Sequence, residues 1–513
     1  MALHLLIIGA NAAGLAAAME ARRRDARCRI TVLEASTDIS WSSCDLPYSM
    51  TSGRSPEDLV LRRPEDFRLQ GIEILLEHRV TELDPLRAQL RGVRAFGQAF
   101  EIGWDRLILC SGARVRPLPD PRGRPANLPG VRSLADGRRL AEALPSARRI
   151  IVIGGGPIGL EVLECLQAPG RELMLLERDP RLLADWPDFV GRALGDRLDS
   201  REIRVRCGQT VSAVEYAGGV ARVHTAAGAP LEADLLVNCA GILPNTDYLP
   251  DGFLQTDSRG LLVVDAQMRT SQPGIFAAGD IVLRRSCVDG RLFWNSQALD
   301  ARRGGRIAGA NAIAADSATP LELPPGPGTL ALSVFGLELA RCGLHCPPGK
   351  EPAGTPGAPL EGFWQDEDGG AARSLLPAPR SVAPQGPGLL GQRQPGNWES
   401  LPVHSAAPGA RVALVRHRSP VSGHRKESRS LELQLEAEAS GGRLRGAVLL
   451  ADGSGALRIN TVAALLQLGA DWSQLEALDL AYTPPLGPAV DPLIQAARRL
   501  GRLIRHTGER DND

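Results

Sequence analysis

The first half of the chain alternates short apolar runs with glycine turns and helical stretches. Residues 5–8 are an apolar run that predicts a strand, the alanine-rich run 15–24 predicts a helix, and residues 29–33 predict a second strand. A strand, a helix and a second strand in this order are typical of a βαβ unit with parallel strands. The pattern therefore predicts an α/β fold.

A second unit of the same kind begins at Arg149. Residues 149–153 predict a strand, a helix begins near Leu160, and residues 172–176 predict the next strand. Two such units in one chain are much harder to obtain by accident than one. We therefore expect two Rossmann-like dinucleotide-binding domains.

The turn of the first unit has the glycines and the acid of a dinucleotide site. It reads Gly-Ala-Asn-Ala-Ala-Gly, and an acidic residue follows the second strand. Such a turn lets backbone N–H groups approach a pyrophosphate at a helix N-terminus, and the acid bonds a ribose hydroxyl. An asparagine replaces the middle glycine, so a glycine turn without a ligand is the alternative. The candidate cofactor residues here are Gly9, Asn11, Ala12, Ala13, Gly14 and Glu34.

The turn of the second unit is a full G-x-G-x-x-G, and an acid again follows the next strand. A carboxylate at that position repels a 2′-phosphate and so favours NADH over NADPH. The adjacent arginine favours NADPH, which stays the alternative. The candidate cofactor residues of this unit are Gly154, Gly156, Pro157, Ile158, Gly159, Glu177 and Arg178.

Length and charge narrow the class of protein. A chain of 513 residues is too long for one core and predicts about three domains. Lys+Arg and Asp+Glu balance at 59 each, which argues against nucleic acid as a partner. The start has no basic n-region, no apolar stretch reaches the length of a membrane span, and the nine cysteines are odd in number and scattered. We expect a cytoplasmic protein with no membrane partner.

Cys44 is the candidate reactive group. It lies in Ser-Trp-Ser-Ser-Cys-Asp-Leu-Pro-Tyr, residues 40–48, shortly after the first nucleotide-binding unit. A two-cysteine reductase would carry a second thiol five residues away, but Ile39 and Ser49 occupy those positions. A lone thiol here predicts flavin-linked redox chemistry at one sulfur. The alternative is a buried structural thiol.

Three further segments resemble the supporting motifs of flavoprotein pyridine nucleotide reductases. Residues 270–280 resemble their second FAD motif, whose aspartate, here Asp280, bonds the ribityl chain of the flavin. Residues 105–113 and 234–245 resemble the strand-and-turn segments that bound the two nucleotide domains. A helix cap or turn is the alternative role of the aspartate. These segments add the candidate residues Ser111, Gly112, Gly241, Gly279 and Asp280.

With this order of motifs the chain resembles the single-cysteine class of FAD-dependent pyridine nucleotide-disulfide oxidoreductases, and within it coenzyme A-disulfide reductase. The redox segment 40–48, residues 64–67, and the C-terminal segments 458–461 and 478–485 carry the resemblance. It implies FAD and NAD(P)H as cofactors. It also implies a homodimer in which Tyr482 reaches the active site of the partner subunit.

The motif order also implies the division into domains. The expected domains are a discontinuous FAD domain (1–115 and 246–320), an NAD(P) domain (116–245) and an α+β dimerisation domain (321–513). Within the last, residues 345–408 are rich in proline and glycine and predict a long irregular insertion.

The insertion contains tryptophans and adjoins two cysteines. Trp364 and Trp398 make a partner-binding surface the alternative to a plain surface loop. Cys342 and Cys346 are expected to be ordinary thiols, with a metal site or a redox pair as the alternative.

The substrate residues are where the chain departs from the resemblance. Asp45 stands where a small residue is usual, and its charge opposes ionisation of the neighbouring thiol. Some lysines expected to bind coenzyme A are not matched, and Arg23 and Arg302 are the candidate replacements. Ser40 and Ser43 are candidate hydrogen-bond donors to the thiolate, or turn serines that cap a helix.

The resemblance implies a reaction at one sulfur. NAD(P)H reduces FAD, the flavin reduces a mixed disulfide on Cys44, and the thiolate attacks a small disulfide such as coenzyme A disulfide, with Tyr482 as proton donor. Related peroxidases that use a sulfenic acid often carry a histidine where this chain has Ala12, which favours the mixed disulfide. Alternative acceptors are persulfide, polysulfide, peroxide or oxygen. A flavin-bound interaction protein that has lost turnover is the alternative of another class.

Overall fold

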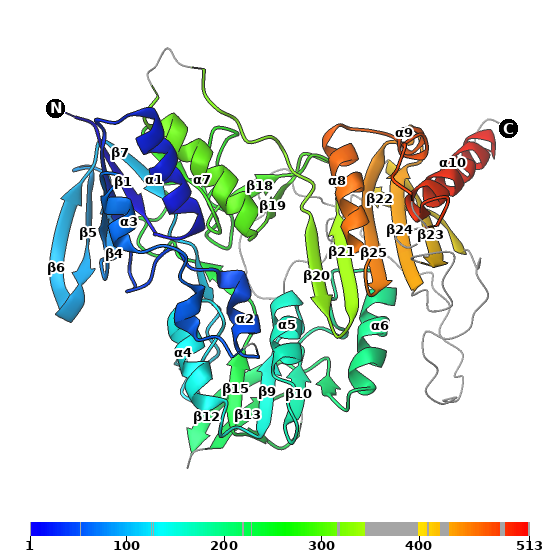
Figure 1. The fold of residues 1–513 in the computed structure, drawn as a ribbon, viewed down its shortest axis with the longest axis horizontal. Helices are drawn as coiled ribbons and strands as arrows, with labels where there is room; N and C mark the ends of the chain where they lie inside the picture. The colour runs from blue at the N-terminus through cyan, green and yellow to red at the C-terminus, as the bar shows by residue number, and fades with distance from the viewer. Residues whose placement is uncertain are drawn as a thin grey trace. The chain divides into compact units, whose positions relative to one another are not determined.

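The chain forms two compact units (Figure 1). The computed structural model describes residues 2–51, 53–124, 126, 128–217, 220–226, 228–314, 319–343, 399–407, 410–420, 430–482 and 488–510. Unit 1 comprises Met1–Ala184, Ile203–Ser286 and Gly290–Pro325, and unit 2 comprises Asp185–Glu202, Cys287–Asp289 and Gly326–Asp513.

The first sheet of unit 1 has five parallel strands in the order β17-β7-β1-β2-β3. Strand β1 is bonded on both edges, so its main-chain groups are satisfied and its apolar side chains are buried on both faces. The bounds are β1 (His4–Ile8), β2 (Arg29–Leu33), β3 (Ile72–Leu75), β7 (Arg106–Leu109) and β17 (Ile275–Ala277).

Side chains of β1 alternate between two cores. Leu5 and Ile7 join the core that includes helices α1 (Ala12–Arg24) and α7 (Ala298–Ala312). Leu6 and Ile8 join the core on the other face, which an antiparallel sheet completes. That sheet consists of β4 (Arg79–Asp84), β5 (Gln89–Arg94) and β6 (Gln98–Gly103).

Glycines let helices α1 and α7 meet backbone to backbone, and the two lie side by side in Figure 1. A Cβ on Gly305 would lie 2.1 Å from the carbonyl oxygen of Ala13, and one on Gly309 would lie 2.2 Å from that of Ala17. Because both pairs advance by four residues, the helices run parallel. This contact fixes the first turn of α1.

The second sheet of unit 1 repeats the parallel plan in the order β11-β10-β9-β15. Helix α5 (Pro157–Cys165) follows β9 and begins three residues before the predicted start, because Pro157 suits the first helical position. An antiparallel sheet of β12, β13 and β14 packs against this sheet. The bounds are β9 (Arg149–Ile153), β10 (Glu172–Leu176), β11 (Arg204–Arg206), β12 (Val211–Ala217), β13 (Val220–Thr225), β14 (Leu231–Ala233) and β15 (Leu235–Asn238).

Two short strands join the segments that were expected to bound the nucleotide domains. Strand β8 (Ala113–Val115) pairs antiparallel with β16 (Ile242–Pro244). The amide of Asn245 also donates to the carbonyl of Gly112 at 2.9 Å. The two chain segments that connect the first parallel sheet of unit 1 with the second are therefore hydrogen-bonded to each other.

Residues 43–68 form short helices, and an arginine connects this part of the chain with helix α4 (Leu134–Ala143). The short helices are η1 (Ser43–Asp45), α2 (Leu46–Ser49), η2 (Pro56–Leu59) and α3 (Pro64–Arg68). Arg138 on α4 donates two hydrogen bonds to Asp38 and one to Glu57, each 2.8 Å long. A Cβ on Gly137 would lie 2.6 Å from Leu46 Cδ1, so α4 touches α2 directly.

Unit 2 is built on one antiparallel sheet in the order β20-β21-β25-β24-β23-β22, with three helices among its core elements: α8, α9 and α10. Residues 399–407, the end of the predicted insertion, form β22 because they pair with β23. Trp364, Trp398 and Cys346 lie outside the described residues. The bounds are β20 (Leu330–Val334), β21 (Leu337–Cys342), β22 (Glu399–Ala407), β23 (Ala410–Pro420), β24 (Ser430–Glu438), β25 (Leu444–Asp452), α6 (Asp188–Asp199), α8 (Ile459–Gln467), α9 (Trp472–Glu476) and α10 (Pro492–Arg510).

The α/β fold class with Rossmann-like parallel sheets is confirmed. Among the described residues, none of the helices combines the length and apolarity needed to cross a lipid bilayer. The described residues also contain no group of three His, Cys, Asp or Glu side chains that could hold a metal ion. The boundaries of the FAD, NAD(P) and dimerisation domains stay a prediction.

Substituting Gly305 by alanine tests the α1–α7 contact. We expect Gly305→Ala to lower the free energy of unfolding by about 1–3 kcal/mol, because its Cβ overpacks the backbone of α1. The measurement is urea unfolding followed by tryptophan fluorescence. Gly195→Ala on α6 is the control, since no atom from outside the backbone of its own helix and its chain neighbours lies within 4 Å of its Cβ position. Alanine there stabilises a helix by about 0.5–1 kcal/mol. Equal stability of the two variants would contradict the packing argument.

Candidate active site

The first glycine turn brings three backbone segments into close contact. Gly9 has a φ of +100°, and a Cβ on it would lie 2.2 Å from the carbonyl oxygen of Cys110. A Cβ on Gly14 would lie 1.8 Å from the carbonyl oxygen of Gly9. Neither position accepts a side chain, so both glycines are required by the packing of the protein itself.

The start of α1 is left open to an anion. Asn11 is the N-cap residue but its side chain makes no capping bond, and the first turn has no acidic residue. Helix α4 of the same unit is closed instead, by a capping box between Ser133 and Asp136. The first N–H groups of α1, including those of Ala12 and Ala13, are the donors that a pyrophosphate requires. The turn therefore fits the diphosphate of FAD.

The second glycine turn has the same geometry. Gly154 has a φ of +110°, and its Cβ would lie 2.2 Å from the carbonyl oxygen of Cys239, while a Cβ on Gly159 would lie 1.9 Å from that of Gly154. Gly156 is the N-cap of α5, with no side-chain cap and open space where its Cβ would be. Pro157 and Ile158 form the first turn of α5. This turn fits a second dinucleotide.

Each turn is paired with an acid at the end of the next strand. Glu34 accepts hydrogen bonds from the amides of Ala10 and Ser36, both at 2.9 Å. Glu177 accepts from the amides of Gly155 at 2.5 Å and Asp179 at 2.7 Å. The same plan in both units holds each carboxylate beside its glycine turn, where a ribose would lie.

The adjacent Arg178 is charge-compensated. Its Nε lies 3.5 Å from a carboxylate oxygen of Asp179. A guanidinium paired in this way is less available to a 2′-phosphate. The preference for NADH over NADPH stays a prediction.

The second FAD segment lies against the first turn of α1. Gly279 has a φ of +83°, and a Cβ on it would lie 3.0 Å from the side chain of Ala13. Asp280 follows it and accepts a 2.6 Å hydrogen bond from Arg132, while its carbonyl accepts one from Trp294. The structure therefore brings together two segments that are more than 250 residues apart.

The remaining candidate cofactor residues lie next to the paired strands β8 and β16, in the segments that connect the two parallel sheets of unit 1. Ser111 donates a 2.6 Å hydrogen bond to the carbonyl of Asn245, and its oxygen lies 3.2 Å from Tyr248 Oη. Gly112 and Gly241 have positive φ values of +67° and +106°. The geometry shows a structural use for these residues. A role in cofactor binding stays a prediction.

Cys44 lies in η1 and is an exposed residue. Burial of part of the residue raises the pKa of the thiol, and the charge of Glu161 raises it further, as does that of Asp45. A hydrogen bond with Ser43 and the charge of Arg132 lower the same pKa. The opposing charge of Asp45 has the direction expected from the sequence. The role of Ser43 as a hydrogen-bond donor to the thiolate stays a prediction.

The backbone of Ser40 connects the redox segment with the first glycine turn. It has a left-handed φ of +46°, its amide donates to the carbonyl of Ala10 at 3.1 Å, and its carbonyl accepts from Leu61. Its hydroxyl makes no hydrogen bond within the described part of the chain. Ser40 thus positions the segment through its main chain.

Arg132, Glu161 and Tyr48 are neighbours of Cys44 that motif analysis missed as site residues. Arg132 connects the thiol electrostatically with Asp280, and its buried Nε has no partner among the described residues. Tyr48 Oη lies 3.5 Å from a carboxylate oxygen of Glu161. Of these three residues, only Tyr48 could have been found from the sequence, because it belongs to the redox segment 40–48.

A second thiol, that of Cys165, lies on α5. Unlike Cys44 it is buried, and burial raises its pKa to about 11, helped by Glu164. A buried thiol with such a pKa is a poor nucleophile at neutral pH. Its place near Tyr48 nevertheless makes it a useful control position.

The two candidate substrate arginines lie far apart along parallel helices. Arg23 near the end of α1 bonds Glu20 at 2.5 Å, whereas Arg302 near the start of α7 is exposed. Because residue 305 faces residue 13, Arg302 lies beside the start of α1, about 20 Å from Arg23 along the helix axis. The structure does not bring them together.

Tyr482 is half exposed in the segment after α9 of unit 2. Its reach into the active site of a partner subunit stays a prediction.

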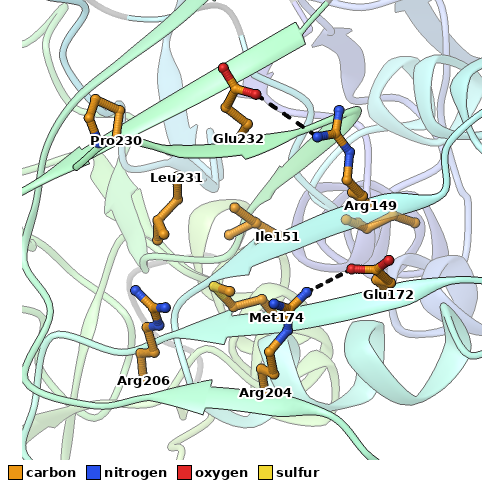
Figure 2. A pocket seen from close by; sticks show the side chains of 10 residues that line it. Arg149, Ile151, Glu172, Met174, Arg204, Arg206, Pro230, Leu231 and Glu232 are labelled. Atoms are coloured by element: carbon orange, nitrogen blue, oxygen red, sulfur yellow. Dashed lines mark hydrogen bonds and ion pairs between the residues drawn. The ribbon is translucent and has the colours of Figure 1, made fainter. Parts of the chain in front are cut away.

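One hollow of about 430 Å³ lies over one face of the second parallel sheet, beside residues 230–232 (Figure 2). Arg149, Glu172 and Arg204 line it, and each is the first residue of its strand. Ligands of parallel sheets bind at the carboxyl ends of the strands, where the glycine turn lies. Figure 2 also shows the ion pair between Arg204 and Glu172. The hollow is therefore separate from the nucleotide site.

Comparison with known proteins decides the family. A model of the pyridine nucleotide-disulphide oxidoreductase family matches residues 3–304. The chain belongs to this family. The match includes both glycine turns, Cys44 and Asp280. The protein is thus an oxidoreductase, and its cofactors are FAD and a nicotinamide dinucleotide.

Three relatives illustrate the range of the family. A Pyrococcus horikoshii protein named NAD(P)H coenzyme A polysulfide/persulfide reductase is 26% identical over 504 residues, covering 97% of this chain and 98% of its own. An Enterococcus faecalis NADH oxidase is 26% identical over 67% of this chain and 76% of its own. The structure of an NAD-dependent persulfide reductase from A. fulgidus matches with a TM-score of 0.79 and 26% identity, covering 99% of this chain and 84% of that one.

Substituting Gly156 by alanine tests whether the open space at α5 belongs to a dinucleotide. We expect Gly156→Ala to change the free energy of unfolding by less than about 0.5 kcal/mol, because its Cβ meets no protein atom. The Kd for NADH, measured by calorimetry, is expected to rise about tenfold or more, since the methyl group occupies the pyrophosphate side of the turn. Gly159→Ala is the contrasting variant and is expected to destabilise the fold. Unchanged NADH binding in Gly156→Ala would place the dinucleotide elsewhere.

The pairing of Arg178 gives a second prediction. The wild type is expected to show a higher kcat/KM with NADH than with NADPH. Asp179→Asn removes the charge that compensates Arg178, so it is expected to narrow this ratio several-fold. Asp185→Asn is the control at a carboxylate that pairs with Arg341 instead. A ratio that widens in Asp179→Asn would contradict the argument.

Proposed function

We propose that the protein is an NAD(P)H-dependent reductase of a sulfur–sulfur bond in a small molecule, with Cys44 as the sulfur that reacts. Coenzyme A disulfide is the substrate that the redox segment favours. The observation that carries the proposal is an exposed cysteine in a segment whose backbone is bonded through Ser40 to the first glycine turn. A thiol in such a position receives electrons from a flavin and passes them to a sulfur substrate.

Residues around Cys44 supply opposing influences on its thiolate. The Ser43 hydroxyl and the Arg132 charge stabilise the thiolate, whereas Glu161 and Asp45 oppose it. Since the net shift of the thiol pKa is upward, the thiolate fraction without substrate is small at neutral pH. Bound FAD would supply the two-electron reduction that returns an oxidised Cys44 to its thiolate.

The exposed face of α7 supports an anionic substrate. Arg302, Arg303 and Arg306 are exposed on this helix and make no ion pair within the described residues. Arg306 lies four residues after Arg302 and three residues after Arg303, so the three side chains lie toward one side of the helix. Coenzyme A carries phosphates that such a face attracts. Arg302 is thus the better supported of the two substrate arginines proposed from the sequence.

Persulfide or polysulfide is the second candidate substrate. The similarity to the P. horikoshii reductase extends over almost the whole of both chains, which favours sulfane sulfur as an acceptor. Oxygen is the third candidate, because NADH oxidases share part of this similarity. All three reactions use the same scaffold and differ in what reaches Cys44.

Replacing Cys44 tests the proposal. We expect Cys44→Ser to lose at least about 1000-fold of the turnover with coenzyme A disulfide and with polysulfide, because serine cannot form a mixed disulfide. NADH should still bleach the bound flavin of this variant. Cys165→Ser is the matched control and is expected to keep its turnover, since its thiol is buried. The mass of the adduct on Cys44 in the wild type then names the substrate class. Full activity of Cys44→Ser would overturn the proposal.

A further inference from the structure

The antiparallel sheet β12-β13-β14 covers only part of the second parallel sheet. The parallel strands have the order β11-β10-β9-β15, and within the described elements the cover lies against β9 and β15. The hollow of about 430 Å³ is lined by the starts of β9 and β10, by β11 and by residues 230–232 beside β14. It therefore lies where this cover ends.

The floor of the hollow is apolar. Ile151 on β9 and Met174 on β10 are partners in the strand register, so their side chains lie next to each other on one face of the sheet. Leu231 of β14 packs against the apolar cluster that contains both. A cavity of this volume with apolar walls is typical of a site for a small molecule.

Four of the charged side chains that line the hollow form ion pairs. Arg204 pairs with Glu172 at 2.8 Å, and Arg149 pairs with Glu232 at 4.0 Å. Arg149 also contacts Asp234, which does not line the hollow, at 2.8 Å. The two arginines and two glutamates of the lining therefore compensate each other.

The fifth charged residue of the lining, Arg206, is left without a counter-charge. It is exposed, and its side chain makes no ion pair or hydrogen bond within the described part of the chain. Figure 2 shows its guanidinium group pointing from β11 toward Leu231. Its main chain is fixed, because its carbonyl accepts a 2.9 Å hydrogen bond from the amide of Glu177. A guanidinium group with free N–H groups binds a carboxylate through two parallel hydrogen bonds.

We propose that the hollow is a binding site for a small monocarboxylate with an apolar or aromatic body. The carboxylate pairs with Arg206, and the body of the ligand covers Ile151, Met174 and Leu231. One uncompensated positive charge matches one negative charge on the ligand. A second negative charge would meet the glutamates of the lining, and a cation would meet Arg206. The site is separate from Cys44 and does not rest on the proposed function.

Binding of 2-naphthoate to the FAD-bound protein tests the proposal. The measurement is isothermal titration calorimetry in the presence of saturating NAD⁺, which keeps the nucleotide site occupied. We expect one naphthoate per chain. The neutral analogue 2-naphthylmethanol has the same ring system, and its Kd is expected to be about tenfold higher or more, because it lacks the charged hydrogen bonds. Absence of naphthoate binding, displacement of naphthoate by NAD⁺, or equal binding of the alcohol would overturn the proposal.

Variants of Arg206 locate the site. Arg206→Gln is expected to raise the Kd for 2-naphthoate about tenfold or more. Arg206→Glu is expected to reverse the preference, so that it binds 2-naphthylmethylammonium and no longer binds the carboxylate. A misfolded protein would bind neither, so the reversal separates a lost site from a lost fold. Arg148→Gln is the matched control, since this exposed arginine precedes β9 but does not line the hollow, and we expect it to bind 2-naphthoate as the wild type does. Unchanged naphthoate binding in Arg206→Gln would also contradict the proposal.

Discussion

The site of unit 1 depends on the first turn of α1 being held in place by backbone contacts that leave its N–H groups free. Gly14 touches Gly9 from within the unit, Gly305 touches Ala13 from α7, and Gly279 touches Ala13 from the second FAD segment. A capping side chain would satisfy the same N–H groups and close the site, as Ser133 does on α4. Packing therefore replaces capping here, and the free donors are available to a diphosphate.

The same plan occurs twice, but one position differs in an informative way. Gly156 in the second turn corresponds to Asn11 in the first, and both are N-cap residues. A Cβ at Gly156 meets no protein atom, so the protein alone does not require glycine there. Asparagine is also a favoured N-cap residue. The replacement that weakens the sequence motif is thus compatible with the fold, whereas Gly9 and Gly14 are not replaceable.

Local patterns predicted the parts of the site that are close in sequence. The strand before each glycine turn, the turn itself and the acids Glu34 and Glu177 follow from the apolar runs and the motif spacing. Arg132 and Glu161 did not follow, because they reach Cys44 through the packing of α2, α4 and α5, about 90 to 120 residues away. No periodicity of a single segment encodes such a contact.

The same limit explains two other differences. Arg23 and Arg302 were grouped by charge, but the parallel direction of α1 and α7 separates them, and direction is a property of the fold. Residues 399–407 were included in an insertion because of the surrounding prolines and glycines. Their strand exists because β23 offers a free edge, which composition does not report.

Charge around Cys44 bears on which sulfur compound reacts there. Glu161 and Asp45 place negative potential at the thiol, so an anionic polysulfide meets repulsion that a neutral disulfide bond does not. The phosphates of coenzyme A lie at the far end of a long flexible arm, which separates their charge from the reacting sulfur. Under the proposed function, the arginines of α7 would attract that charge on a different element. Protonation of Glu161 would remove the larger of these two charge effects, so a persulfide anion would also become acceptable. The ionisation of one carboxyl on α5 would then decide how narrow the substrate range is.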